Sequence, residues 1–267
     1  MEIKFEHNTF RRRLKSMLKV DFRRMFTSRL FYIITGTCLV IPILILVMTT
    51  MMDGSVSVNP QTGEETVMEA FDSTWQIIGT ISSEDSAAGM DMLSMCNINL
   101  LYFAVAALVC IFTAEDFRSG YVKNLFTVRA KKTDYVISKT LVCFIGGAFM
   151  MLAFLAGTII GGVIAGLSFE MTGFGVSQLV MCILSKMLLT AVFVPIYLLM
   201  SVIAKQKLWL SILLSMMTGM LLFMMIPMLS PLDAAFMNVI LCLCGGALFS
   251  IGLGAVSNHI LKKTSLV

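Results

Sequence analysis

A short acidic and aromatic segment, Glu115 to Leu125, holds the residues best suited to recognising a partner. Its first residues, up to Arg118, include no His or Cys, so the segment lacks the groups for acid–base or nucleophilic catalysis. Taken as a helix from about Phe117, it carries an apolar stripe on one side, as a helix lying flat on a membrane does. We expect the acidic pair at the start of that helix, where the helix dipole favours negative charge, and Gly120 to leave room for a partner. The expected contact residues are Glu115, Asp116, Phe117, Arg118, Gly120, Tyr121 and Leu125.

A second set of candidate residues lies inside apolar runs. Lys186 is well inside one of them, where a charge costs roughly 2.5 to 3.5 kcal/mol on insertion scales. We expect its amine to snorkel toward the outer headgroups. The alternatives are a place on a substrate path or between subunits. The next run contains Met217, Met220 and Met224, whose flexible thioethers suit varied apolar ligands, although such side chains more often face lipid or the core. With Lys186 they form a candidate transport path.

The sequence offers little support for metal, redox or ATP chemistry. Its cysteines lie in or at the ends of apolar runs, no CxxC pair occurs, and His7 and His259 lack suitable neighbours, so we expect no metal site. No Gly-x-x-x-x-Gly-Lys-Ser/Thr loop occurs, so energy must come from a partner unless transport is passive or ion-driven. The apolar runs contain no acidic residue, which disfavours an ion-coupled carrier. We expect neither a catalytic residue nor a cofactor in this chain.

Composition indicates that membrane helices position these residues. Hydrophobic residues make up 58% and charged residues 13% of the chain, whereas a soluble domain has about a quarter charged residues. Runs of about 20 apolar residues predict spans, and in lipid only helices satisfy the backbone of such runs. The six runs are Leu30–Thr50, Met95–Thr113, Thr140–Ala165, Leu179–Ala204, Leu208–Met228 and Phe236–Val256. The sequence therefore predicts an all-α polytopic membrane protein with six transmembrane helices.

Basic residues predict the orientation of these spans. Lys and Arg are frequent before Leu30, between Arg118 and Lys139, and near the chain end, and none lies between Arg29 and Arg118. Because basic residues favour the inside, we expect a multi-pass protein of the plasma membrane with both termini in the cytoplasm. The expected regions are an N-terminal interfacial helix in 1–29, a transmembrane domain in 30–256 and a cytoplasmic tail in 257–267. Within the domain, 51–94 forms an acidic outer loop and 114–139 a cytoplasmic coupling segment.

Two of these regions have a simpler alternative. The N-terminal helix is either held on the anionic inner leaflet, where each basic residue is worth roughly 1 kcal/mol, or a plain positive anchor with no further role. The acidic outer loop either attracts cationic substrates or is a solvated loop without a part in transport.

Together these features resemble the permease subunit of type-2 ABC exporters. The resemblance rests on the N-terminal helix, the six spans, the large outer loop, and one cytoplasmic series: Glu115, Gly120, Lys123, Leu125, Arg129 and Lys139. The family's Glu and Gly-Thr pattern occurs here as Glu115 and Gly120-Tyr121, without the Thr. Membership implies that the segment after the second span contains a coupling helix that docks on an ATPase. It further implies a bacterial membrane, a dimer with a second copy or a paralogue, and a separate subunit that binds ATP and Mg.

Hydrophobic or amphipathic peptides are the substrates we expect, in toxin export or immunity. The chain is short, has no added soluble domain for sugar recognition, and offers apolar Met and Phe surfaces. Export of lipid, drug or polysaccharide is the first alternative. An ion-coupled secondary transporter, a membrane-embedded enzyme and a membrane assembly protein are the others. Membrane lipid is an expected partner, and nucleic acid is not.

Overall fold

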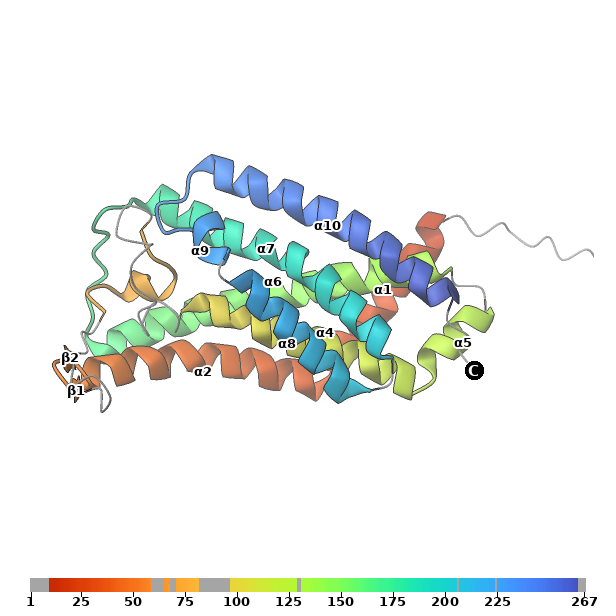
Figure 1. Cartoon of the computed structure of the whole chain (residues 1–267), viewed down its shortest axis with the longest axis horizontal. Helices are drawn as coiled ribbons and strands as arrows, with labels where there is room; N and C mark the ends of the chain where they lie inside the picture. The colour runs from red at the N-terminus through yellow and green to blue at the C-terminus, as the bar shows by residue number, and fades with distance from the viewer. Residues whose placement is uncertain are drawn as a thin grey trace, which may run out of the picture.

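The computed structural model describes residues 10–58, 65–67, 71–81, 97–128, 131–205, 207–223 and 225–263. These residues form an elongated bundle of helices (Figure 1). In chain order the elements are α1 (Phe10–Thr27), α2 (Arg29–Met51), β1 (Val56–Val58), β2 (Glu65–Val67), the 3₁₀ helices η1 (Thr74–Ile77) and η2 (Ile98–Leu100), α4 (Leu101–Arg118), α5 (Tyr121–Val128), α6 (Lys132–Ala165), α7 (Val176–Ala204), α8 (Leu208–Phe223), α9 (Ile226–Leu229) and α10 (Phe236–Lys263).

Five helical segments are long and apolar enough to cross a membrane, namely α2, η2 with α4, α6, α7 and α10. The predicted all-α polytopic membrane fold is therefore confirmed. The two strands in the described part have three residues each and pair as one antiparallel hairpin, so they do not change the fold class.

The fifth expected span, Leu208–Met228, differs from the prediction. Its helix α8 has 16 residues and ends at Phe223, a length of about 24 Å at 1.5 Å per residue, short of the roughly 30 Å hydrocarbon core. Pro227 lies in the first turn of the separate helix α9, where its missing N–H costs no hydrogen bond. The chain then packs back on the bundle, because the Leu232 N–H donates to the Thr80 carbonyl over 2.9 Å.

Helices α2 and α6 pack closely because glycines of α6 face α2. A Cβ atom at Gly157 would overlap the carbonyl oxygen of Leu39 and lie 2.7 Å from Cγ of Pro42. A Cβ at Gly161 would lie 2.8 Å from the Cα of Ile43. Small residues at this spacing let two helix backbones approach within lipid, where packing drives association. The contact lies within one chain.

The most buried spans are η2 with α4 and α7, while α10 and α2 expose most of their surface. Figure 1 shows α1, α5 and the C-terminal end of α10 at one end of the bundle, which we call the basic end. The exposed side chains of α2, α8 and α10 are mostly apolar, as lipid-facing surfaces are.

The described part of the expected acidic loop packs on the bundle. Ser73 caps η1, and the backbone N–H of Thr74 donates to the carbonyl of Ser168 over 2.9 Å. Ile77 and Ile78 are fully buried. This part is therefore no simple solvated loop, while residues 59–64, 68–70 and 82–94 of the loop lie outside the described residues.

Candidate functional site

The segment expected to form one helix from Phe117 contains a break. Helix α4 continues to Arg118, Gly120 has φ +71°, and α5 begins at Tyr121. Gly tolerates this left-handed backbone, and helices commonly end on it. The acidic pair therefore lies in the last turn of α4 and not at the start of the next helix, so the predicted dipole stabilisation is wrong.

Asp116 is fully buried at this helix end and is stabilised by three donors. The nearest are Arg24 Nη1 at 2.6 Å and Lys139 Nζ at 2.7 Å, and the Tyr135 hydroxyl donates over 3.1 Å. A negative charge is disfavoured at a helix C-terminus, so these donors compensate both for the dipole and for lost hydration. The neighbouring Glu115 is exposed.

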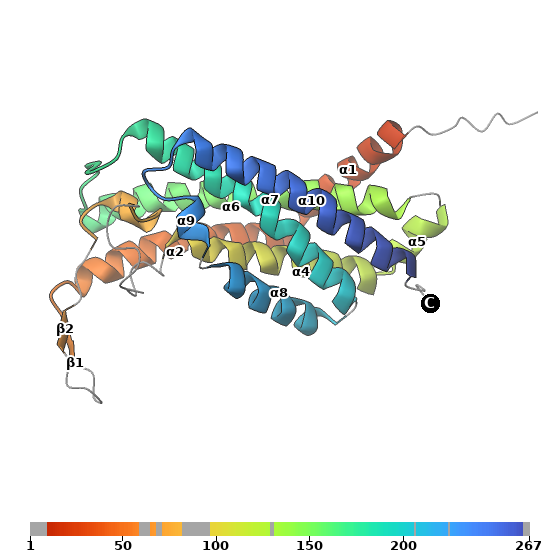
Figure 2. The ribbon, with the colours of Figure 1, turned by 45° about the horizontal axis from the view of Figure 1, so that its top comes forward.

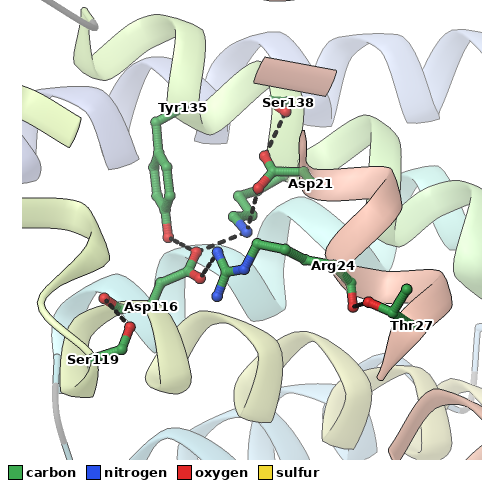
Figure 3. A network of polar contacts seen from close by, with 8 residues as sticks. Asp21, Arg24, Thr27, Asp116, Ser119, Tyr135 and Ser138 are labelled. Carbon is green, nitrogen blue, oxygen red and sulfur yellow. Dashed lines mark hydrogen bonds and ion pairs between the residues drawn. The ribbon is translucent and has the colours of Figure 1, made fainter. Parts of the chain in front are cut away.

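Asp21 of α1 completes what we call the charge network (Figure 3). Its carboxylate accepts from Lys139 Nζ at 2.9 Å and from the Ser138 hydroxyl at 2.6 Å, and it is fully buried. Lys139 therefore bridges the two aspartates. The network comprises Asp21, Arg24, Asp116, Tyr135, Ser138 and Lys139. Two acidic and two basic side chains give it no net formal charge, so no buried charge lacks a partner of opposite sign.

Aromatic rings extend the charge network to α5. The Cζ atom of Arg24 lies 4.3 Å from the ring centroid of Tyr121, and Lys139 Nζ lies 3.7 Å from that of Phe112. Burial would lower the pKa of Arg24, but the charge of Asp116 and its hydrogen bond raise it above the ordinary value. Burial, followed by the charges of Asp21 and Asp116, raises the pKa of Tyr121. A charged guanidinium thus stacks on a neutral phenol and joins α1 to α5.

Two further contacts fix the start of α6 at the basic end. Arg13 Nε lies 2.9 Å from a carboxylate oxygen of the buried Asp134. Lys132 Nζ donates to the carbonyl of Leu261 in α10. At the basic end, ion pairs, hydrogen bonds and ring contacts therefore join α6 to α1, α4 and α10, and α1 to α5.

The apolar side of the expected contact segment faces the protein itself. Phe117 is buried, and Tyr121 and Leu125 are half-buried, with Leu125 packed on the core. The expectation that these side chains form an exposed stripe for a partner is corrected, because the charge network and the core occupy them. The residues left exposed on and beside α5 are Glu115, Arg118, Ser119, Lys123, Asn124 and Thr127.

Lys186 does not snorkel outward as predicted. The side chain is fully buried, with Nζ 2.9 Å from Asn99 Oδ1 and 3.2 Å from Ser230 Oγ. The Tyr102 hydroxyl also donates to the carbonyl of Lys186 over 2.9 Å. These acceptors, which η2 and the end of α9 bring to α7, let the amine bond inside the bundle. Lys186 thus ties three segments together.

The candidate transport path is not assembled as one set of side chains. Met217 and Met220 are 62% and 69% exposed on the outward side of α8, whereas Lys186 is buried. Met224 lies outside the described residues. Within the described ranges, no group of three or more His, Cys, Asp or Glu side chains has the arrangement of a metal site.

Comparison with known proteins gives a family match. A family model described as "ABC-2 family transporter protein" matches residues 17–222, a range that runs from α1 through α8. No curated protein and no solved structure matches the chain.

Proposed function

The chain belongs to the ABC-2 family of transporter proteins, and we propose that it exports hydrophobic or amphipathic peptides, using ATP hydrolysed by a separate subunit. The family makes the chain a multi-pass membrane permease of an ABC exporter with an ATPase partner. The sequence has no phosphate-binding loop, which supports the proposal that ATP and Mg are bound by that partner. A second permease subunit, identical or paralogous, completes the transporter we propose.

The charge network is the observation that supports coupling between the ATPase and the membrane helices. It lies directly behind α5 and links that helix through Tyr121 and Arg24 to α1, and through Asp116 and Lys139 to α4 and α6. We propose that the ATPase docks on the exposed side of α5, around Lys123 and Asn124. A displacement of α5 would then move three membrane-associated helices together, because buried ion pairs resist separation.

Tyr121 variants test this coupling. In Tyr121→Ala, loss of a cation–π contact worth about 0.5–2 kcal/mol should lower the transport achieved per ATP severalfold while ATP hydrolysis persists. Tyr121→Phe keeps the ring over Arg24 and should retain normal transport. Transport and ATP hydrolysis would be measured with the co-expressed ATPase in vesicles. Equal transport per ATP in the Ala variant and the wild type would remove Tyr121 from the coupling route.

Orientation is the second testable part of the proposal. If the basic end is cytoplasmic, a cysteine in Ser119→Cys should react with a membrane-impermeant maleimide only after the inner face is opened. Ser119 is exposed beside Gly120, so the site is accessible to the reagent. Ser55→Cys, exposed after α2, is the matched control and should react in intact cells. Labelling of Ser119→Cys from outside would reverse the topology.

The peptide substrate is supported by the apolar surfaces of the spans. Exposed methionine and phenylalanine side chains occur on α8 and α10; such surfaces also suit lipid, but Met side chains adapt to varied apolar ligands. Vesicles containing the permease and its ATPase would be supplied in turn with an amphipathic peptide, a short-chain lipid and a cationic drug. We expect the peptide to stimulate ATP hydrolysis and to accumulate. Accumulation of the lipid or drug alone would replace the proposed substrate class and leave the exporter assignment intact.

A further inference from the structure

The outward side of α1 carries basic side chains that the charge network does not use. Arg11, Lys15, Lys19 and Arg23 follow one another at intervals of four residues, which places them along one side of a helix. All four are exposed, and none forms an ion pair with another described residue. We call this set the outward stripe.

On the inward side of the same helix, basic side chains form ion pairs within the protein. Met17, Asp21 and Met25 are buried there, at the same interval of four residues. The basic residues on this side, Arg13 and Arg24, meet the carboxylates of Asp134 and Asp116. Helix α1 therefore has inward basic residues with acidic partners, and an outward stripe that is exposed to a ligand.

The outward stripe directly precedes a membrane-length helix, which favours a position near the lipid headgroups. A single residue, Ser28, separates α1 from the membrane span α2, and Figure 2 shows α1 leaving the bundle obliquely at the basic end. The first turn of α2 already exposes Tyr32 and Ile33, at 60% and 65%. The Tyr32 hydroxyl donates to the Phe26 carbonyl over 2.8 Å. Tyrosine is typical of membrane interfaces, where its ring contacts lipid and its hydroxyl forms a hydrogen bond.

We propose that the outward stripe binds the anionic headgroups of phospholipids in the adjoining leaflet. Lys and Arg donate charge-assisted hydrogen bonds to phosphate oxygens, and a row of them matches a charged surface. A protein partner fits less well, since lysine is depleted in protein interfaces and hot spots are aromatic. Bound lipid holds α1 against the bundle and so keeps Asp21 and Arg24 in the charge network.

The test measures which lipids the purified full-length protein retains. Native mass spectrometry would follow the protein taken from an equal mixture of phosphatidylglycerol and phosphatidylcholine. The stripe variant is Lys15→Gln/Lys19→Gln/Arg23→Gln. Each basic residue near an anionic leaflet raises the preference for anionic lipid about fivefold. The ratio of bound phosphatidylglycerol to bound phosphatidylcholine should therefore fall up to roughly a hundredfold in the variant. This measurement needs neither the ATPase nor a transport assay.

The matched control removes the same charge elsewhere at the basic end. Lys207→Gln/Lys262→Gln/Lys263→Gln changes three exposed lysines outside α1 and should keep the wild-type preference. Wild-type protein should also melt at a higher temperature in phosphatidylglycerol than in phosphatidylcholine nanodiscs, and the stripe variant should not.

Three results would overturn the proposal. One is a stripe variant that retains the wild-type lipid preference within about threefold, since three lost contacts predict far more. Another is an equal loss in the control variant, which would make net charge the cause. The third is wild-type protein that retains phosphatidylglycerol and phosphatidylcholine equally, which would show that it has no headgroup preference.

Discussion

Replacing Lys139 by Met should lower the free energy of unfolding by about 3–5 kcal/mol, the usual cost of removing one partner from a buried ion pair. Lys139 is completely buried and lies within 2.9 Å of Asp21 and 2.7 Å of Asp116. Without its amine, two buried carboxylates share the single positive charge of Arg24. Methionine has a similar length, so lost packing contributes little to the change. Denaturant unfolding of the purified protein in a fixed detergent, followed by circular dichroism, measures the loss.

A charge-balanced variant separates this electrostatic effect from a packing defect. Asp21→Asn/Lys139→Met removes one charge of each sign and leaves Asp116 paired with Arg24. Neutral replacements of buried ion pairs are often tolerated, so the double variant should regain most of the stability lost in Lys139→Met. A double variant no more stable than Lys139→Met would show that the amine itself, and not the balance of charge, is required.

Hydropathy predicted the class of fold because membrane insertion depends on local composition. The five long spans are present, but the run expected to end at Thr113 continues as α4 to Arg118. Its charged end stays helical because Arg24 and Lys139 compensate Asp116. Arg24 and Asp116 are 92 positions apart in the sequence, so a hydropathy pattern, which compares near neighbours only, does not predict their contact.

Some features of the site could have been found in the sequence. Asp21 lies four residues from both Met17 and Met25 on the apolar side of α1, and a carboxylate in that place indicates a buried partner. Gly120 after Ser119 is typical of a helix end, so the sequence already indicated a break in the helix that we predicted to be continuous from Phe117. The partner of Lys186 could not be found in this way, since Asn99 precedes it by 87 residues.

Substituting Ala for Gly157 should destabilise the protein by about 3 kcal/mol, at the upper end of the usual cost of overpacking. The new Cβ would overlap the carbonyl oxygen of Leu39 and lie 2.7 Å from Pro42 Cγ. Both belong to the α2 helix, one to its backbone and one to a rigid ring, so neither can turn aside as a flexible side chain does. The helices α2 and α6 must separate, and the loss of their packing is measured by the same unfolding assay.

Gly252→Ala is the matched control for this substitution. Gly252 also lies inside a membrane-length helix, α10, but a Cβ there would meet nothing within 4 Å. Alanine has the higher helix propensity, by about 1 kcal/mol, so the control should be neutral or stabilising. Since both variants make the same chemical change in a helix, their difference isolates the close approach of α2 to α6. Equal unfolding free energies for the two variants would mean that α2 and α6 do not pack backbone to backbone at Gly157.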